Sequence, residues 1–218
     1  MRVGTDGVLL GAWTGISGAR KILDVGTGTG LIAIMLAQRS NAKITGVEIE
    51  KNAAREAFTN ALQSPWRGRI NILHASFQEF AAAAPGKFDL VVSNPPFFIN
   101  DKRPADHRKS VARHHDRLSL HDLVIGADRL LTQKGRLSVV LPVFSAEILM
   151  RLAHDFNLYL IKLTEVKPEE GKSTHRYLME FSKTKKATEK EIIAIRKSGS
   201  DGYTEEYKNI TRNFYLNF

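Results

Sequence analysis

The sequence predicts an α/β fold, a doubly wound and mostly parallel sheet with helices on both faces. Short apolar runs typical of buried strands alternate with segments of helical periodicity along most of the chain. A glycine-rich turn follows the first of these runs, at the place where such folds bind ligands. A length of 218 residues, with 43% hydrophobic and 25% charged residues, suits one domain. We therefore expect seven strands in a single domain spanning residues 1–218.

The first half of the chain supplies four of the predicted strands. Residues 1–17 predict a short helix or turn that packs across one edge of the domain and flanks the ligand site. Apolar runs predict strands at residues 21–26, 43–49, 70–73 and 88–92. Apolar residues at helical spacing predict a helix after Gly30 and another over residues 54–62, which Pro65 ends.

The second half supplies three more strands. Ser119 and Asp122 resemble a capping box that opens a helix reaching Leu131. Another helix carries apolar residues from Ile148 to Phe156. The strands themselves are predicted at residues 135–141, 158–166 and 177–181.

Two segments are predicted to lie outside this alternating pattern. Residues 98–118 show no sustained apolar periodicity and predict a mobile basic loop. Residues 184–218 are predicted to form a C-terminal extension that packs on the domain, with a helix around Tyr207 and Ile210. Within this extension, the apolar run 192–195 is too short to assign to a strand or a helix.

Composition bounds the environment and the partners. The net charge of +9 is compatible with a polyanionic partner, although many basic proteins bind none. The absence of cysteine excludes disulfides and cysteine-ligated zinc. No run approaches 18 apolar residues, and the N-terminus lacks the apolar core of a signal peptide. We therefore expect a cytoplasmic protein without membrane contact. As a separate expectation, the protein acts as a monomer.

An unusual turn, Ser93-Asn94-Pro95-Pro96-Phe97, follows the fourth predicted strand. Consecutive prolines fix φ twice and remove two backbone N–H donors. The Asn94 side chain and the Pro95 carbonyl are left as fixed acceptors beside the ring of Phe97. A planar substrate with an amino group fits, because the amine can donate to both acceptors while its ring stacks on Phe97. A proline-rich turn with Asn94 as a local cap and Phe97 in the core is the structural alternative.

Two other features fall outside the carboxyl ends of the predicted strands. The loop Asp24-Val25-Gly26-Thr27-Gly28-Thr29-Gly30 lets backbone approach a ligand before a helix N-terminus, although its spacing differs from the dinucleotide fingerprint. Glu48 ends the second strand about 20 residues further on, where a carboxylate can bind both ribose hydroxyls. A solvated strand-end carboxylate would also explain Glu48. Together the loop and Glu48 predict an adenosine-type cofactor.

The turn after the fourth strand distinguishes between such cofactors. Hydride transfer has no evident use for Asn94–Phe97, whereas methyl transfer to a conjugated amine does. The exocyclic nitrogen of adenine and an amide nitrogen are poor nucleophiles because their lone pair is delocalised. Accepting both N–H bonds favours a more tetrahedral nitrogen. S-adenosylmethionine carries an activated methyl group, so the protein mainly supplies alignment and electrostatic stabilisation.

These motifs resemble motif I, the acidic loop and motif IV of class I S-adenosylmethionine-dependent N-methyltransferases. Residues 4–13, residues 63–66, His175-Arg176 and the ending from Tyr203 narrow the resemblance to the bacterial tRNA1(Val) adenine-N6 methyltransferases. The resemblance covers nearly the whole chain and implies a Rossmann-like sheet with an antiparallel last strand. It also implies methylation of N6 of adenine 37, beside the anticodon of tRNA, with S-adenosyl-L-methionine as the cofactor.

The resemblance assigns roles by position. It places the target adenine against Asn94, Pro95, Pro96 and Phe97. It places the cofactor against Thr5, Asp6, Asp24, Gly26, Gly28, Gly30, Glu48, Ile49, Ser76, Phe77 and Asn94. Ser76 departs from the family, which often has Asp there, and its hydroxyl or the Phe77 backbone would substitute. Family members also usually carry aromatic and basic residues before the segment at Gly4, so Met1 is expected to mark a shortened start.

The segment after the turn is predicted to bind RNA phosphates, because an RNA stem must approach there. Its cations are Lys102, Arg103, Arg108, Lys109, Arg113 and Arg117. A solvated mobile loop is the alternative. The three histidines of this segment, His107, His114 and His115, do not predict a metal site, since no cysteine or suitably spaced carboxylate accompanies them.

Other functions fit part of the pattern. A protein-glutamine N5 methyltransferase uses a similar turn on an amide, but it usually carries a helical domain before the fold. A DNA adenine methyltransferase needs an added target-recognition segment, and no long insertion is present. A non-catalytic RNA-binding domain would leave the cofactor and amine motifs unexplained, and a nicotinamide-binding domain would leave Asn94–Phe97 unexplained.

Overall fold

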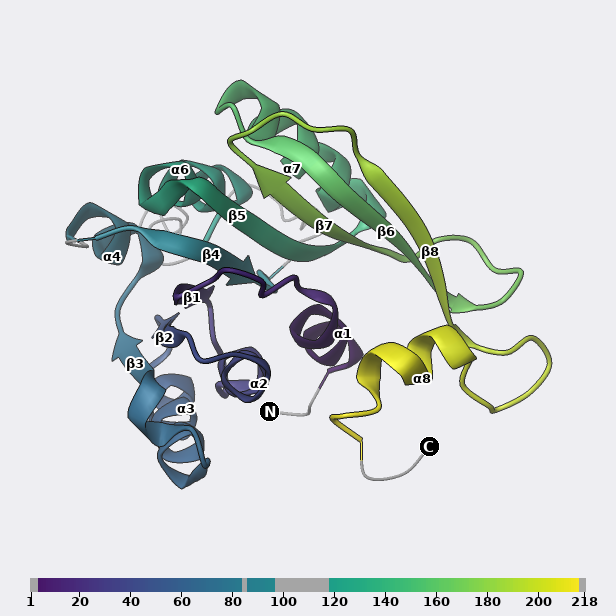
Figure 1. The fold of residues 1–218 in the computed structure, drawn as a ribbon, viewed down its shortest axis with the longest axis horizontal. Coiled ribbons are helices and arrows are strands. Elements are labelled where there is room, and N and C mark those ends of the chain that lie inside the picture. Colours follow the sequence, from purple (N-terminus) through teal and green to yellow (C-terminus); the bar gives the residue numbers. More distant parts are fainter. Residues whose placement is uncertain (1–3, 84–85, 97–117, 216–218) are drawn as a thin grey trace, which may run out of the picture.

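One mixed sheet of eight strands forms the centre of the structure (Figure 1). The computed structural model describes residues 4–83, 86–96 and 118–215. The strand order is β3-β2-β1-β4-β5-β7-β6-β8, and every neighbouring pair is parallel except the two that β7 makes. The strands are β1 Lys21–Val25, β2 Lys43–Glu48, β3 Ile70–His74, β4 Phe88–Ser93, β5 Leu131–Pro142, β6 Tyr159–Glu169, β7 Arg176–Ser182 and β8 Glu189–Arg196.

The eighth strand corrects the count of seven that the sequence predicts. The antiparallel strand is β7, the seventh in chain order, as the resemblance implies. β8 then returns along the far side of β6 and runs parallel to it. Of the short apolar run 192–195, only Ile193 is fully buried. Pairing with β6, rather than an apolar pattern, therefore makes this segment a strand.

Helices cover both faces of the sheet (Figure 1). α1, α2 and α8 contribute to one apolar layer, with α3 beside α2, and α4, α6 and α7 contribute to the other. The sequence predicts a helix at each of these places except α4, with residues 1–17 expected as a helix or a turn. The helices are α1 Thr5–Trp13, α2 Leu31–Arg39, α3 Lys51–Gln63, α4 Phe77–Ala83, α6 Leu120–Leu130, α7 Val143–Asp155 and α8 Glu205–Thr211, with a 3₁₀ turn at Arg67–Arg69.

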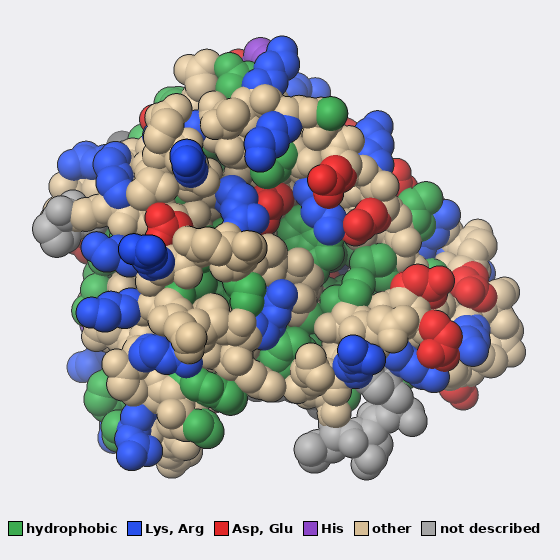
Figure 2. Space-filling model, in the orientation of Figure 1, with side chains coloured by type: hydrophobic (Ala, Val, Ile, Leu, Met, Phe, Trp, Pro, Cys, Tyr) green, Lys and Arg blue, Asp and Glu red, His purple; other side chains and the backbone are tan. Residues whose placement is uncertain are grey.

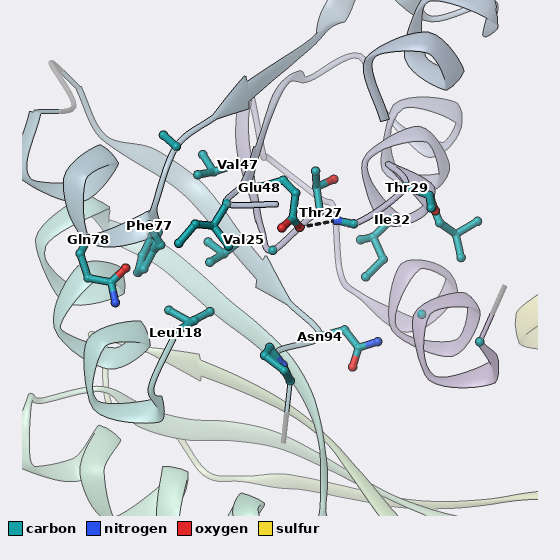
Figure 3. A pocket seen from close by; sticks show the side chains of 18 residues that line it. Val25, Thr27, Thr29, Ile32, Val47, Glu48, Phe77, Gln78, Asn94 and Leu118 are labelled. Carbon is teal, nitrogen blue, oxygen red and sulfur yellow. Dashed lines mark hydrogen bonds between the residues drawn. The ribbon is translucent and has the colours of Figure 1, made fainter. Parts of the chain in front are cut away.

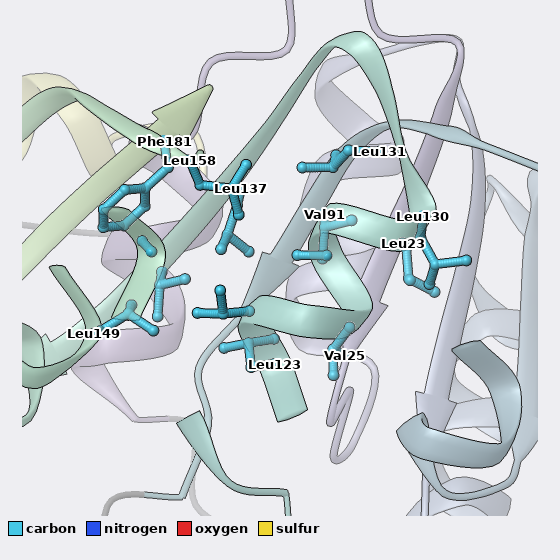
Figure 4. Close-up of a cluster of buried hydrophobic side chains, with 14 of the residues drawn as sticks. Leu23, Val25, Val91, Leu123, Leu130, Leu131, Leu137, Leu149, Leu158 and Phe181 are labelled. Atoms are coloured by element: carbon cyan, nitrogen blue, oxygen red, sulfur yellow. The ribbon is translucent and has the colours of Figure 1, made fainter. Parts of the chain in front are cut away.

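The two apolar layers follow from the alternation of side chains along the central strands. Ile22 and Leu90 face α1 and α2, whereas Leu23 and Val91 face α6 and α7 (Figure 4). Successive side chains of a strand point to opposite faces, so strands covered on both faces are apolar throughout. Each such buried side chain contributes roughly 1.5–3 kcal/mol. This packing holds the central strands, and so the loops that leave them, in fixed positions.

The two ends of the described chain pack on the same face. α1 buries Leu10, and Trp13 at its end donates its Nε1–H to Thr164 Oγ1 of β6 at 2.9 Å. α8 buries Tyr207, whose hydroxyl lies 2.9 Å from that of Tyr215. The helix predicted within the C-terminal extension is therefore present, and it lies against the same apolar layer as α1.

Parallel pairing brings three strand ends together. Val25, the last residue of β1, is in register with Val47 of β2 on one side and with Ser93 of β4 on the other. Gly26, Glu48 and Asn94, which come next along these strands, consequently lie side by side. We call this side of the sheet the carboxyl edge and the opposite side, where the parallel strands begin, the amino edge. The ends of β5, β6 and β8 also reach the carboxyl edge.

A buried carboxyl group, Asp24, organises the loop after β1. Its Oδ2 accepts hydrogen bonds from the Thr27 hydroxyl at 2.6 Å and from the Ala33 backbone N–H at 3.1 Å. Its Oδ1 has no partner within the described residues. Burial raises the pKa of Asp24 to about 7, with a smaller upward contribution from the charge of Glu48, although the two hydrogen bonds oppose the rise. Asp24 therefore joins β1, the loop and α2, but it places an ionisable group in the core, where its charged form is unfavourable.

We predict that Asp24 makes the protein less stable as the pH rises from about 4 to about 7. The folded state holds the proton of Asp24 up to a pKa of about 7, whereas the unfolded chain releases it near 3.8. The stability from this group is thus complete below the lower pKa and is lost through the upper one. Urea denaturation across this range should show the free energy of unfolding of the wild type falling relative to Asp24→Asn, by on the order of 4 kcal/mol.

Asp155→Asn is the matched control for this experiment, because Asp155 is exposed at the end of α7. Its free energy of unfolding should follow that of the wild type at every pH. Parallel curves for Asp24→Asn and the wild type would show that Asp24 is ionised at no cost in the folded state.

Candidate active site

A cavity of about 440 Å³ opens at the carboxyl edge, between the loops that follow β1 to β4 and the start of α1 (Figure 3). Its volume lies in the range of pockets that bind small molecules. The cavity is where open α/β sheets hold their ligands. Its lining residues are Gly4, Gly7, Val25, Gly26, Thr27, Gly28, Thr29, Leu31, Ile32, Val47, Glu48, Ile49, Ala75, Phe77, Gln78, Asn94, Pro96 and Leu118.

The glycine loop crosses the cavity with its backbone exposed to the ligand space. The N–H groups of Gly26 and Thr27 donate to the Val47 carbonyl at 2.9 and 3.1 Å, which holds the start of the loop against β2. Gly28 and Gly30 have φ of 57° and 84°, in the left-handed region that favours glycine. A Cβ at Gly30 would also lie 3.3 Å from that of Ala57, so glycine lets α2 begin close to α3.

Glu48 joins the loop to the end of β2. One carboxylate oxygen accepts from the N–H of Gly28 and the other from that of Glu50, each at 2.9 Å. An ionised carboxylate offers about four acceptor positions, so each oxygen can accept a further hydrogen bond. The side chain is half-buried and lines the cavity, as Figure 3 shows. Glu48 can therefore hold a ligand with two neighbouring hydroxyl groups without releasing the loop.

Asn94 brings an amide to the same cavity from the end of β4. The hydroxyl of Ser93 donates to the Val25 carbonyl at 2.9 Å, which fixes this strand end beside β1. Within the described chain the Asn94 amide makes no hydrogen bond, and its side chain is half-buried in the cavity wall (Figure 3). Pro95 is buried and does not line the cavity, while Pro96 is exposed and lines it. An acceptor is thus left available to a ligand.

Phe77, Gln78 and Leu118 lie together at one end of the cavity (Figure 3). Of the predicted pair Ser76 and Phe77, only Phe77 lines it. The Ser76 hydroxyl donates to Glu79 at 2.8 Å and accepts from the Glu79 N–H at 3.1 Å, so it caps the start of α4. Sequence reasoning missed Gln78 because the helix that presents it was not predicted. Its amide donates to Asp122, in the capping box of α6, at 3.1 Å.

The start of α1 closes the other side. Gly7 lines the cavity, whereas Thr5 and Asp6, which the resemblance assigns to the cofactor, do not. Asp6 instead forms an ion pair with Arg176 at the start of β7, at 3.0 Å. The resemblance thus places Asp6 at the cofactor, while the structure shows it anchoring α1 to the sheet.

The structure brings most of the remaining predicted residues together. Gly26, Gly28, Glu48, Ile49, Phe77, Asn94 and Pro96 line one cavity, whereas Asp24, Gly30 and Pro95 are buried and do not line it. Phe97 and the predicted RNA-binding residues of the basic loop lie outside the described residues, as do His107, His114 and His115. Among the residues that are described, no cluster of His, Asp and Glu could hold a metal ion. No described helix is long and apolar enough to cross a membrane.

Solved structures share the fold. A protein from Agrobacterium tumefaciens, described as a predicted O-methyltransferase, aligns with a TM-score of 0.74 at 20% identity, over 95% of this chain and 96% of its own. A glycopeptide N-methyltransferase solved with S-adenosyl-L-methionine aligns with a TM-score of 0.60 at 12% identity, over 83% of this chain and 99% of its own. At such identities the likeness shows the architecture alone.

Comparison with related sequences identifies the family. Residues 8–157 match the model of the methyltransferase small domain. The tRNA1(Val) (adenine(37)-N6)-methyltransferase of Flavobacterium psychrophilum is 42% identical over 218 residues, which cover 99% of this chain and 93% of the relative. A protein of the same name from Trichodesmium erythraeum is 42% identical over 221 residues, covering 100% of this chain and 92% of the relative. The chain therefore belongs to the family of tRNA1(Val) (adenine(37)-N6)-methyltransferases.

Proposed function

We propose that this protein transfers a methyl group from S-adenosylmethionine to the exocyclic N6 of adenine 37 in a valine tRNA. The observation that carries the proposal is the Asn94 amide, which opens onto the same cavity as Glu48 and the glycine loop. A cofactor site and an amine-binding turn thus meet at one edge of the sheet. Family membership supports the substrate, since the relatives named above act on this nucleotide.

The residues of the cavity fit S-adenosylmethionine. Glu48 would accept hydrogen bonds from the two ribose hydroxyls, and the backbone of Gly26 and Gly28 would pass beneath the cofactor. Phe77 and Leu118, at one end of the cavity, provide an apolar place for its adenine ring. When bound, the cofactor supplies an electrophilic methyl group on a positively charged sulfonium.

Asn94 and Pro95 would prepare the target nitrogen. The amide oxygen of Asn94 and the carbonyl of Pro95 accept the two N–H bonds of the adenine amino group, while Phe97 stacks on the ring. The nitrogen lone pair would then be available for an in-line displacement, which the protein would assist by alignment and electrostatic stabilisation. Once methylated, the nitrogen is acidic and can release its proton to water, so no strong general base is needed.

The segment after the Asn94 turn would bind the RNA. We infer that the basic loop contacts phosphates around the anticodon, where adenine 37 is already unpaired and can be flipped at low cost. The ordinary location of tRNA supports a cytoplasmic enzyme. We further propose that the protein acts as a monomer with a single domain.

We expect Asn94→Ala to lower kcat at least about 100-fold, because it removes an acceptor aimed at the reacting nitrogen. Wild type and variant would be incubated with methyl-labelled cofactor and total bacterial tRNA, and the labelled nucleoside identified after digestion. The proposal expects N6-methyladenosine with the wild type and almost none with Asn94→Ala.

Asn71→Ala controls for loss of an asparagine, because Asn71 is exposed on β3 and does not line the cavity. It should label tRNA as the wild type does. Label in a protein fraction instead of tRNA would move the assignment to a glutamine amide, and equal labelling by Asn94→Ala would remove Asn94 from the reaction.

We expect Glu48→Gln to weaken cofactor binding by about 10- to 100-fold, since hydrogen bonds to a charged group are worth about 1.5–3 kcal/mol. Isothermal titration with S-adenosylmethionine would measure the Kd, and tRNA binding should be unchanged. Glu206→Gln, on the exposed side of α8, is the control and should bind the cofactor normally. An unaltered Kd for Glu48→Gln would contradict its role as the ribose ligand.

Neutralising Arg108, Lys109 and Arg113 to Gln should reduce the salt dependence of tRNA binding. Each lost phosphate contact lowers the slope of log Kd against log salt by about 0.7–0.9, so the slope should fall by about 2–3. Filter binding between low and high salt would measure it. A slope equal to that of the wild type would show that the loop does not bind phosphates.

A further inference from the structure

Exposed cations gather on the amino edge of the sheet, the side opposite the cavity. These cations lie in the first residues of β1, β2, β5 and β8, just before β1, and in the connector after β7. All of them are exposed. We call these side chains the amino-edge cations: Arg20, Lys21, Lys43, Lys134, Lys186 and Lys190. Figure 2 shows many Lys and Arg side chains over the upper and left parts of the molecule, and most Asp and Glu towards the right.

The amino-edge cations form a row of like charges. Lys21 and Lys43 are direct partners in the parallel register of β1 and β2. From β2 to β8 the row crosses six strand spacings, or about 30 Å. Within the described residues none of the six side chains forms an ion pair or a hydrogen bond. Like charges side by side on a sheet are unfavourable, so this row does not contribute to folding.

Acidic side chains near this edge are already engaged. Asp89 accepts the backbone N–H groups of Arg20 and Lys21 at 2.9 and 3.0 Å. Asp128 pairs with Lys183 at 2.8 Å, and Glu180 pairs with Arg136 at 3.1 Å. In the described part of the chain, Asp155 and Glu189 are exposed acids near the row for which no ion pair is seen. The amino edge therefore keeps a positive excess.

Helix capping does not account for the row. Arginine side chains that stabilise carbonyls in this part of the fold are different residues. Arg69 donates to the carbonyls of Ala37, Ser40 and Ala42 at 2.7–3.1 Å, and Arg39 donates to those of Gly11 and Thr14. The amino-edge cations lie at strand ends and in a connector, outside the last turns of helices where a macrodipole would favour them.

Several cations at the carboxyl edge are engaged within the protein. Arg176 pairs with Asp6 at 3.0 Å, Lys208 pairs with Glu205 at 3.1 Å, and Arg196 lies 5.0 Å from the ring of Tyr203. In the described part of the chain, the larger group of cations without a protein partner is thus on the edge away from the cavity.

We propose that the amino edge binds phosphates of the substrate RNA outside the loop that holds the target adenine. This inference rests on the proposed function for the identity of the RNA. β4 has six residues and spans roughly 20 Å, so a double helix leaving the cavity can reach the amino edge along one face of the protein. Lysines bind phosphates as point charges without reading bases, so the contact adds affinity for a whole tRNA.

The test compares two RNAs, a full-length valine tRNA and its isolated anticodon stem-loop. Binding of each is measured at several salt concentrations for the wild type and for the triple variant Lys21→Gln, Lys43→Gln, Lys134→Gln. We expect the triple variant to bind the full-length tRNA about tenfold more weakly, with a log-log salt slope lower by about 2–3. Its binding and methylation of the stem-loop should equal those of the wild type.

Lys172→Gln, Lys197→Gln, Lys208→Gln is the charge-matched control, since it removes the same number of charges away from the amino edge. It should leave the ratio of full-length to stem-loop affinity unchanged. The proposal is overturned if the triple variant binds the full-length tRNA with the wild-type slope, or if it loses affinity for both RNAs equally. Binding is measured apart from methylation, so a wild type that binds tRNA but methylates neither RNA would refute the proposed function alone.

Discussion

The parallel pairing of β1 between β2 and β4 is the constraint on which the site depends. Val25 is in register with both Val47 and Ser93, so the residues that follow these three strands meet within one cavity. Two further bonds secure the junction, from Ser93 to the Val25 carbonyl and from the N–H of Gly26 to the Val47 carbonyl. No loop has to fold by itself to bring Glu48 and Asn94 together, since the sheet does so.

The fixed loop after β1 requires a buried carboxyl group, that of Asp24. Its carboxyl group fixes the loop through Thr27 and Ala33, but burial disfavours its charge and raises its pKa to about 7. Glu48 is half-buried and keeps acceptor positions open, so it can serve a ligand. The two carboxyl groups on neighbouring strands thus divide the work: one maintains the loop, and the other faces the cavity.

Charge is distributed unevenly over the two edges of the sheet. Helices begin at the carboxyl edge, where acidic residues suit their N-termini, and two of these acids, Asp6 and Glu205, pair with Arg176 and Lys208. The amino edge instead carries exposed lysines that form no ion pair within the described parts of the chain. A long anionic substrate that reaches its reacting base at one edge would gain electrostatic affinity at the other. The phosphate contacts would then lie apart from the small cofactor cavity.

The sequence by itself determined the alternation of strands and helices, the glycine loop, Glu48 and the turn at Asn94, because each depends on local periodicity or backbone chemistry. Tertiary structure decided the rest. β8 exists through its pairing with β6, α4 was not predicted from its sequence, and Gln78 reaches the cavity only because α4 forms. Ser76 was assigned to the cofactor by position, yet its hydroxyl caps α4. Contacts between distant segments carry no local pattern, so only the folded chain reveals them.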